Sequence, residues 1–498
     1  MKIGEEAIYQ KPNFLSRPQG IIFIILLIAA LWVVYPGDPA TLALYVVAIV
    51  FLFGLKRPVW AMAALLISQL TITSYMVETP LGIPISLRLC LLLLILIGAL
   101  LLHYRNKGHI KMGKQTKSIL IPAFILVGII IVSNLIYTDF YYTFAEFRNM
   151  MVGLLIIIFL PSVTKDSRDL KILCGAVFVV MVTSAIIGVM QHYQVLGMSQ
   201  HTLIPGFLQQ WGSEEIRVPG IAESELDLSY TVSVVALAIL GILLIRGAKT
   251  SNKWLLAISL MPLGLALYFT YTRSALFAMI LGLVALVMFL RTRIKGEVIL
   301  FGILLVVLFI AVTGLMENQY LGGRDVESQE QSLISRKILW QAGLAIAMDN
   351  PVLGIGGNQY ALVAPQYTGY VDPTLMQFEE ETFWGYRTLG SVQPHNDFLM
   401  IWISYGTLAL AVYLWLYVAI LRNFLRSYEK SNRRFVKGLA IGLAAGLVAY
   451  GVNAFYHNCL ETFPLFWILA GFSLAIAKLA VKEKSQARIS QSSTGASP

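Results

Sequence analysis

The sequence predicts an all-α fold, a polytopic membrane helical bundle of about 14 transmembrane helices (about 12 to 14), with a large outer loop that contains an amphipathic helix. Of the 498 residues, 57% are hydrophobic and only 13% are charged, and the mean hydropathy is +0.74. Apolar stretches long enough to cross a hydrocarbon core of about 30 Å recur along nearly the whole chain. The connections between them are alternately rich and poor in Lys and Arg.

The apolar stretches form three groups that are separated by two long outer connections. The N-terminal bundle, residues 20–191, has spans at 20–35, 41–55, 59–77, 86–103, 119–137, 144–160 and 170–191. Residues 228–315 hold spans at 228–245, 254–271, 274–290 and 298–315. The last group, residues 397–480, holds spans at 397–421, 435–456 and 463–480.

The segments outside these groups are polar. Residues 1–19 form a basic N-terminus, 192–227 and 316–396 are the outer loops, and 481–498 are predicted to be a disordered tail because they are rich in small and polar residues. The first apolar run is interpreted as an uncleaved helix, since no small-x-small cleavage site precedes Pro36 and another span follows at once.

The distribution of basic residues predicts the orientation. Of the 37 Lys and Arg residues, all but eight fall on every second connection, together with both termini. Cytoplasmic loops collect Lys and Arg, so both termini are expected in the cytoplasm. The net charge of +10 then reflects topology and not a nucleic-acid surface. The three cysteines are far apart, without CxxC or Cys/His spacing, which argues against a disulfide framework or a zinc site.

The cations on the predicted outer side are mostly arginines, which topology alone does not require. They are Arg88, Arg148, Arg217, Arg273, Arg324, Arg336, Lys337 and Arg387. A planar guanidinium binds phosphate or carboxylate oxygens in pairs, so this bias indicates an anionic ligand. The alternative is snorkelling or pairing with loop carboxylates, which is favoured for Arg88 and for Arg148, with Glu146 nearby as a partner.

Arg273 has the most distinctive position of these cations. It follows a very tight turn between two spans and begins the next helix, so it is expected at the outer membrane boundary. The free N–H groups and the positive end of the helix dipole add to its charge there. The sequence therefore predicts an anion site at this point.

The second outer loop contains a predicted amphipathic helix. In SLISRKILWQAGLAIAMDN the apolar residues recur at helical spacing, Arg336 lies near the start, and Asp349, Asn350 and Pro351 stop the pattern. The following GIGGN, residues 354–358, is interpreted as a turn and not as a phosphate-binding loop, because no strand precedes it and no Lys-Ser/Thr follows.

The same loop ends in PHND, directly before a long apolar span. Pro394 restricts the backbone, and the residues from His395 through Asn396 to Asp397 suit a helix start. His395 at the membrane surface is a candidate general base, although a lone loop histidine is usually a solvated or capping residue. His457, at another outer helix end, is a weaker candidate for the same role.

Three acidic residues precede the span at 228–245. Glu223, Glu225 and Asp227 have spacing that allows a divalent cation, but acidity at a helix start explains them as well. No DxD motif and no Gly-rich phosphate motif is present in the inner loops, so a nucleotide-using enzyme is disfavoured.

Taken together, an ordered set of short motifs between residues 188 and 471 resembles the O-antigen ligase and O-antigen/exopolysaccharide polymerase family. The motifs are GVMQHY, an outer RVPG, TYTRS at a helix start, SRKILWQAG with DNPVLGIGGNQY, and PHNDFLMIWISYGTLAL. The acidic ESELD after RVPG departs from the less acidic stretch expected of many relatives.

This resemblance implies a membrane glycosyltransferase of the bacterial envelope. Such a protein takes a glycan from an undecaprenyl-diphosphate-linked donor at the periplasmic face of the cytoplasmic membrane and transfers it to a glycan or lipid acceptor, without metal or nucleotide cofactor. By motif, Arg217 and Arg273 would grip the diphosphate and His395 would deprotonate the acceptor. Arg336 is a further candidate for contact with the diphosphate or the glycan, and Asn396 and His457 are candidate substrate-binding residues. Membrane lipid and other polysaccharide-assembly proteins are the expected partners, and nucleic acid is not.

Several alternatives stay open at this stage. Ligase, polymerase and protein O-oligosaccharyltransferase share one site and differ in acceptor, with a slight preference for polymerase from the span count. A lipid-linked oligosaccharide flippase is the alternative from another class, but the span interiors carry few of the charges that transporters place at the midplane. The loop aromatics, Tyr360, Tyr367, Tyr370, Phe383, Trp384 and Tyr386, either stack on sugars or pack the loop.

Overall fold

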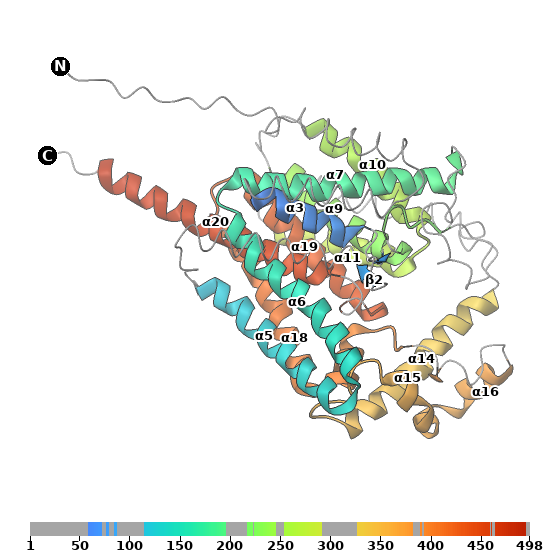
Figure 1. The fold of residues 1–498 in the computed structure, drawn as a ribbon. Coiled ribbons are helices and arrows are strands. Elements are labelled where there is room, and N and C mark those ends of the chain that lie inside the picture. The colour runs from blue at the N-terminus through green and yellow to red at the C-terminus, as the bar shows by residue number, and fades with distance from the viewer. Residues whose placement is uncertain are drawn as a thin grey trace, which may run out of the picture.

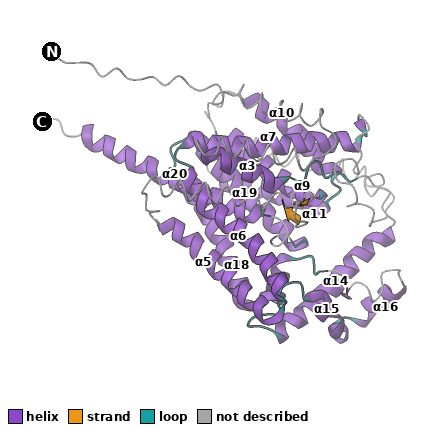
Figure 2. Cartoon of the chain, in the orientation of Figure 1, coloured by secondary structure: helices purple, strands orange, loops and turns teal. Residues whose placement is uncertain are grey.

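The computed structural model describes residues 58–71, 76–78, 84–86, 114–195, 217–245 without 223, 253–290, 326–381, 389–390, 393–458, 460 and 464–494. Within these ranges the chain is a helical bundle with one short antiparallel hairpin (Figures 1 and 2). The predicted spans at 20–35, 41–55 and 298–315 lie outside the described residues, as does the span at 86–103 apart from Ser86.

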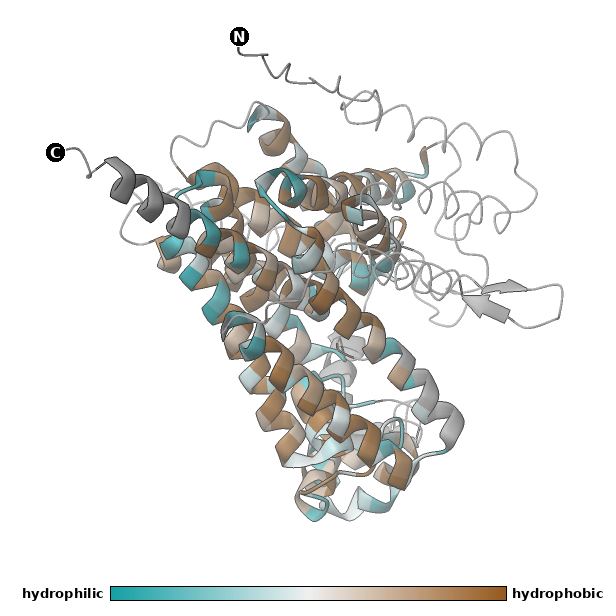
Figure 3. Ribbon diagram, turned by 60° about the vertical axis from the view of Figure 1, so that its left-hand side comes forward, coloured by the Kyte–Doolittle hydropathy of each residue, from teal (hydrophilic) through white to brown (hydrophobic). Residues whose placement is uncertain are grey.

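The bundle confirms the predicted all-α polytopic fold. Seven helices of the described part are long and apolar enough to cross a membrane, and three further apolar helices are shorter. Their hydrophobic residues cover most of the helix surfaces (Figure 3). The bundle helices are α3 (Pro58–Leu70), α5 (Lys114–Tyr137), α6 (Phe140–Val163), α7 (Ser167–His192), α9 (Glu225–Leu244), α10 (Lys253–Phe269), α11 (Arg273–Leu290), α18 (Asp397–Lys430), α19 (Arg434–Tyr456) and α20 (Leu465–Thr494). The total of 14 spans stays a prediction.

Helices α9 and α19 pack at the centre of the bundle and run antiparallel. A methyl group placed on Gly442 would lie 2.6 Å from the Cα of Ala238, and one on Gly446 would lie 3.0 Å from the Cγ1 of Val234. Small residues allow such close helix packing in membranes. The contacts also fix the register, which places the start of α9 beside the C-terminal end of α19.

The described parts of residues 316–396, the predicted outer loop, form helices at one end of the bundle (Figure 1). They are α14 (Val326–Asp349), α15 (Tyr360–Val363), the 3-10 helix η3 (Ala364–Tyr370) and α16 (Pro373–Glu381). The predicted amphipathic helix is confirmed as α14, which buries Ile338, Leu339, Ala342 and Ile346 and ends at Asp349 as predicted.

Helix α18 differs from the single continuous span that the sequence predicts. It breaks at Gly406, where φ is 83° and ψ is 176°. In one straight helix, Phe398 and Tyr413 would lie about 22 Å apart along the axis, yet their ring centroids are 5.8 Å apart. The residues before Gly406 therefore fold back against the rest of α18 and carry the PHND motif toward the bundle.

The turn after α14 stabilises this break. The backbone N–H groups of Ile355 and Gly356 donate to the carbonyls of Ile403 and Ser404 at 3.0 and 2.9 Å, and Thr407 N donates to Pro351 O at 2.8 Å. A methyl group on Gly354 would lie 2.3 Å from the Ile403 carbonyl oxygen, so the close approach needs glycine. The prediction of a turn in GIGGN is confirmed.

Two predicted boundaries are wrong. Helix α3 ends at Leu70, and the chain then forms strands β1 (Met76–Glu78) and β2 (Pro84–Ser86), where a span was predicted to reach residue 77. Helix α20 continues to Thr494, into the stretch predicted to be disordered. Strong helix formers such as Lys, Glu, Ala, Gln and Arg allow the buried part of α20 to propagate outward there.

Glu146, the predicted partner of Arg148, is held by two buried hydrogen bonds; the side chain of Arg148 is outside the described part of the chain, so their pairing stays a prediction. The Glu146 carboxylate accepts hydrogen bonds from the Asn134 amide and the Tyr405 hydroxyl, both buried. Asn134 Oδ1 in turn accepts from Gly357 N at 2.8 Å. Glu146 thus links α5 and α6 to the break in α18.

Candidate functional site

The RVPG motif is held against α7 by the GVMQHY motif. The Gln191 side chain donates to the Gly220 carbonyl at 3.1 Å and accepts from Gly220 N at 2.9 Å. Val218 N donates to the Phe269 carbonyl at 3.4 Å, at the end of α10. These bonds place Arg217 between α7, α9 and the turn that leads into α11.

Arg217 forms an ion pair but retains an unused donor. Its Nη1 lies 3.4 Å from Glu225 Oε1. Its Nε is buried and has no hydrogen-bond partner among the described residues. Ser224 caps α9 by accepting from Asp227 N. Of the three predicted acids, Glu225 thus neutralises an arginine at a helix start, and Glu223 lies outside the described residues.

Helix α14 brings Arg336 to the outer end of α19. Its guanidinium carbon lies 5.9 Å from the centroid of the Tyr456 ring. One turn later, Trp340 Nε1 donates to the Pro394 carbonyl at 2.8 Å. The same helix therefore supplies a cation to the site and holds the residue before His395.

His395 has a backbone conformation that is unusual for a residue with a side chain. Its φ is 50°, in the left-handed region, where strained residues cluster at functional sites. The next residue, Asn396, is buried; its N–H donates to Asn458 Oδ1 at 2.9 Å, and its Oδ1 accepts from Leu399 N at 3.0 Å as the cap of α18. Through these two hydrogen bonds Asn396 fixes the position of the neighbouring His395. Its contribution to substrate binding stays a prediction.

The two outer histidines face each other beside the arginines. The ring centroids of His395 and His457 are 5.8 Å apart, and Tyr230 lies 5.9 Å from His457. Burial and the charge of Arg336 lower the pKa of His395 to about 4. Burial, then the charges of Arg336, His395 and Arg217, holds the pKa of His457 well below its usual value.

The structure thus brings together four of the six predicted site residues, from four separate parts of the chain. Arg217, Arg336, His395 and His457 form what we call the outer cluster. Two guanidinium groups beside two neutral imidazoles favour an anion and leave a ring nitrogen free to accept a proton.

Arg273 occupies a more peripheral position. It begins α11 as predicted, and its side chain is exposed. The preceding Tyr271 has a φ of 49°, and the bond from Val218 to Phe269 joins this turn to the segment that carries Arg217. Arg273 is not among the charges that lower the pKa of either histidine. Its role in gripping a diphosphate stays a prediction.

The lowered pKa of His395 predicts an unusual pH dependence. In the free protein the neutral ring predominates above about pH 4, whereas an ordinary histidine is half protonated at about pH 6.5. An anion bound beside Arg336 would favour the protonated ring and raise this pKa. In pH–rate profiles we expect the acid limb of kcat to lie at higher pH than that of kcat/KM, which reports the free protein. The opposite order would contradict this assignment.

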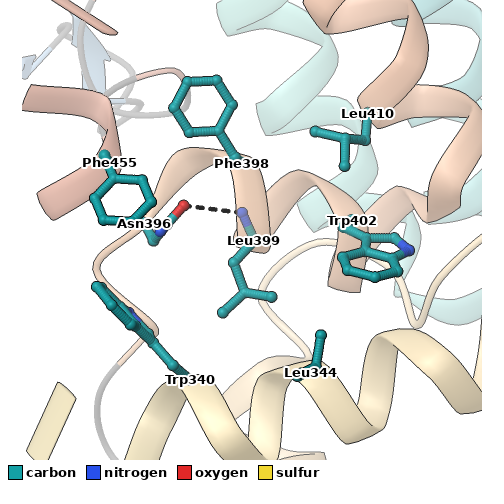
Figure 4. Close-up of a pocket in the computed structure, with 8 residues that line it drawn as sticks. All are labelled: Trp340, Leu344, Asn396, Phe398, Leu399, Trp402, Leu410 and Phe455. Carbon is teal, nitrogen blue, oxygen red and sulfur yellow. Dashed lines mark hydrogen bonds between the residues drawn. The ribbon is translucent and has the colours of Figure 1, made fainter. Parts of the chain in front are cut away.

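An apolar pocket adjoins the outer cluster, with a cavity volume of about 290 Å³. It lies between α14, the first turns of α18 and the end of α19 (Figure 4). Both of its indole N–H groups are engaged, that of Trp340 with Pro394 O and that of Trp402 with Thr407 Oγ1 at 3.0 Å. Its lining residues are Trp340, Leu344, Asn396, Phe398, Leu399, Trp402, Leu410 and Phe455. The pocket therefore suits hydrocarbon better than sugar.

Three of the six loop aromatics, Tyr360, Tyr367 and Tyr370, lie among the described residues, and the sugar-stacking role stays a prediction. Tyr360 is fully buried, and its hydroxyl donates to the Leu339 carbonyl at 2.7 Å, so it packs the loop. Tyr367 and Tyr370 form a tilted pair with centroids 5.6 Å apart, and Tyr370 is 64% exposed. The other three predicted aromatics, Phe383, Trp384 and Tyr386, lie outside the described residues.

Sequence reasoning missed several residues that build the site. Gln191 and Trp340 support the backbone beside Arg217 and His395, and Tyr230 packs on His457. Gln191 and Trp340 lie inside the motifs that carry the resemblance, so the sequence could have indicated them. Tyr230 lies in an apolar helix, where no sequence pattern distinguishes it.

A comparison with family models gives a match of residues 256–414 to the family described as O-Antigen ligase. A comparison with curated proteins gives no match. The matched segment runs from α10 into α18 and includes Arg273, Arg336 and His395. The family match supports a membrane glycan-transferring role in polysaccharide biosynthesis. It confirms the resemblance found in the motifs: residues 256–414 of this multi-pass membrane protein are similar to the O-antigen ligase family.

Proposed function

We propose that the protein transfers or polymerises glycan from an undecaprenyl-diphosphate-linked donor onto an acceptor hydroxyl at the outer face of the cytoplasmic membrane. The observation that carries this proposal is the outer cluster, in which a neutral histidine lies next to two arginines at the end of a membrane bundle. The cluster has the charge to bind a diphosphate and a base to activate a hydroxyl.

The proposed reaction begins with His395. Its neutral ring accepts the proton of the acceptor hydroxyl, and the oxygen forms a bond to the anomeric carbon of the donor sugar. The bond from that carbon to the diphosphate oxygen breaks, and its electron pair leaves with the polyprenyl diphosphate. Arg336 and Arg217 stabilise the negative charge that grows on this leaving group, which favours the transition state over the ground state.

The apolar pocket supports a lipid-linked donor. Arg336 and Trp340 lie one turn apart on α14, and Phe455 precedes Tyr456 and His457 on α19. Trp340 and Phe455 are in edge-to-face contact at 5.4 Å. An anionic head bound at the outer cluster would therefore have hydrocarbon contacts directly beside it. In this proposal the pocket holds the isoprene units next to the diphosphate.

Leu344→Asp tests this placement of the tail. Leu344 lines the pocket and is 40% exposed, so the change is tolerated by the fold. Losing a leucine-sized apolar contact of about 1.5 to 3 kcal/mol should raise KM for the polyprenyl-linked donor about tenfold or more, with little change in kcat. Met348→Asp is the control, because Met348 lies one turn further on α14, is 61% exposed and does not line the pocket. Equal effects of both changes would contradict the assignment.

The proposed function is tested with purified protein in liposomes that contain an undecaprenyl-diphosphate-linked oligosaccharide. Mass spectrometry of the products distinguishes the candidates. Longer lipid-linked glycans indicate a polymerase, glycan joined to a lipid or protein acceptor indicates a ligase or a protein O-oligosaccharyltransferase, and donor that crosses the bilayer with no new glycosidic bond indicates a flippase. The last result would overturn the proposal. Added chelator is expected to leave the rate of glycan transfer unchanged.

A further inference from the structure

Asn453 is a buried amide near the outer cluster that stands out for its hydrogen bonding. Its side chain lies on α19 and is 0% exposed. Neither Nδ2 nor Oδ1 has a hydrogen-bond partner among the described residues. An unsatisfied polar group is costly inside a membrane bundle, where water does not compensate it. Such a group in a native fold calls for a ligand or another specific explanation.

The position of Asn453 relates it to the outer cluster. His457 follows it by one helical turn on the same face of α19, about 5.4 Å further out, and His457 N donates to the Asn453 carbonyl at 3.0 Å. Tyr450, on the inner side, reaches the Asp397 carboxylate of α18 at 3.5 Å. Asn453 thus lies directly beneath the histidine pair.

The neighbouring helices place further unsatisfied atoms at this level. A methyl group on Gly282 of α11 would lie 3.2 Å from Ala449 Cβ, and this antiparallel register brings Ser274 to the level of the outer end of α19. Ser274 Oγ is buried without a partner among the residues that the structure covers. Arg217 Nε is in the same situation, and its ion pair with Glu225 holds it at the start of α9.

The chemistry of the orphaned atoms points to a class of ligand. Phosphate oxygens accept hydrogen bonds but donate none, so a diphosphate would satisfy Nδ2 and leave Oδ1 unpaired. A sugar hydroxyl or an acetamido group both donates and accepts. We propose that Asn453 recognises the first sugar of the donor, one helical turn from where the outer cluster binds the diphosphate. This inference rests on the proposed function.

The test compares the binding of three lipids to the full-length protein in detergent. They are undecaprenyl diphosphate without sugar and the same lipid with a single hexose or a single N-acetylhexosamine. The wild-type protein should bind at least one sugar-bearing lipid more tightly than the sugar-free lipid. Asn453→Leu should weaken the binding of that lipid about tenfold and leave the sugar-free lipid unaffected.

Thermal unfolding separates recognition from a structural role. Leucine matches the shape of asparagine and removes two unsatisfied atoms, so Asn453→Leu should raise Tm or leave it unchanged. A lower Tm in both Asn453→Leu and Asn453→Ala would show that the amide has a structural partner and would overturn the inference.

The matched control for the binding experiment is Asn423→Leu. Asn423 lies on α18 and is another buried asparagine with an unsatisfied Nδ2 among the described residues, and its replacement should not change the discrimination between lipids with and without sugar.

The remaining outcomes distinguish the two proposals. Wild-type protein that binds all three lipids equally would overturn the inference about Asn453 and leave the proposed function intact. Equal weakening of all three by Asn453→Leu would have the same meaning. Wild-type protein that binds none of them would remove the proposed function and this inference with it.

Discussion

Replacing His395 with alanine is expected to lower glycan transfer by about 10²- to 10⁴-fold, the range typical of a lost general base. The ring lies beside Arg336 and His457 in a strained backbone segment. Product formation from the lipid-linked donor in liposomes is the measurement. Binding of undecaprenyl diphosphate should persist, because the arginines remain.

His109→Ala is the matched control for this experiment. His109 lies in a basic connection that the sequence places on the cytoplasmic side, and its replacement should leave the rate unchanged. Added imidazole should restore part of the activity of the His395→Ala protein, since it can enter the space left by the ring. Near-normal transfer by His395→Ala would exclude His395 as the base.

Replacing Arg336 with methionine should lower kcat by about 10²- to 10³-fold, comparable to the loss of one oxyanion-hole donor. Of the neighbouring charges, the Arg336 guanidinium lowers the pKa of each of the two histidines the most. Arg336→Lys should recover only part of this loss, because an ammonium group keeps the charge but not the paired donors. The acid limb of kcat/KM should also move to higher pH in Arg336→Met.

The neighbouring residue offers a stringent control for Arg336. Lys337 is exposed and lies about 100° around α14 from Arg336, so Lys337→Met removes the same charge from the same helix at an exposed position. Its rate should remain within a factor of about two, as expected for an exposed charge that makes a weak contribution. A similar loss in both proteins would mean that overall charge matters and not the position of Arg336.

Much of the bundle was predictable because membrane spans leave a strong local signal. The apolar stretches at 119–137, 144–160 and 435–456 appear as α5, α6 and α19 with small shifts at their ends. The amphipathic helix α14 was predictable for the same reason, since its buried positions recur with helical spacing. The arginine bias on the outer side singled out Arg217 and Arg336, both of which reach the cluster.

The break in α18 was not predictable from such patterns. ISYGTLAL has the composition of an uninterrupted span, and a single glycine is tolerated in most membrane helices. What bends the helix at Gly406 is a turn about fifty residues earlier, whose N–H groups pair with the freed carbonyls. The pairing of His395 with His457 depends on this bend, so it could not be read from either motif.

The insertion of the 351–357 turn into the bend of α18 has a consequence for engineering. The loop that contains this turn is not a detachable cover, since its backbone completes the helix that carries the proposed base. Chimeras that exchange the loop alone between relatives would misplace His395 even if every residue of the cluster were retained. Exchange of the loop together with residues 397–407 would preserve the joint between the turn and the bend.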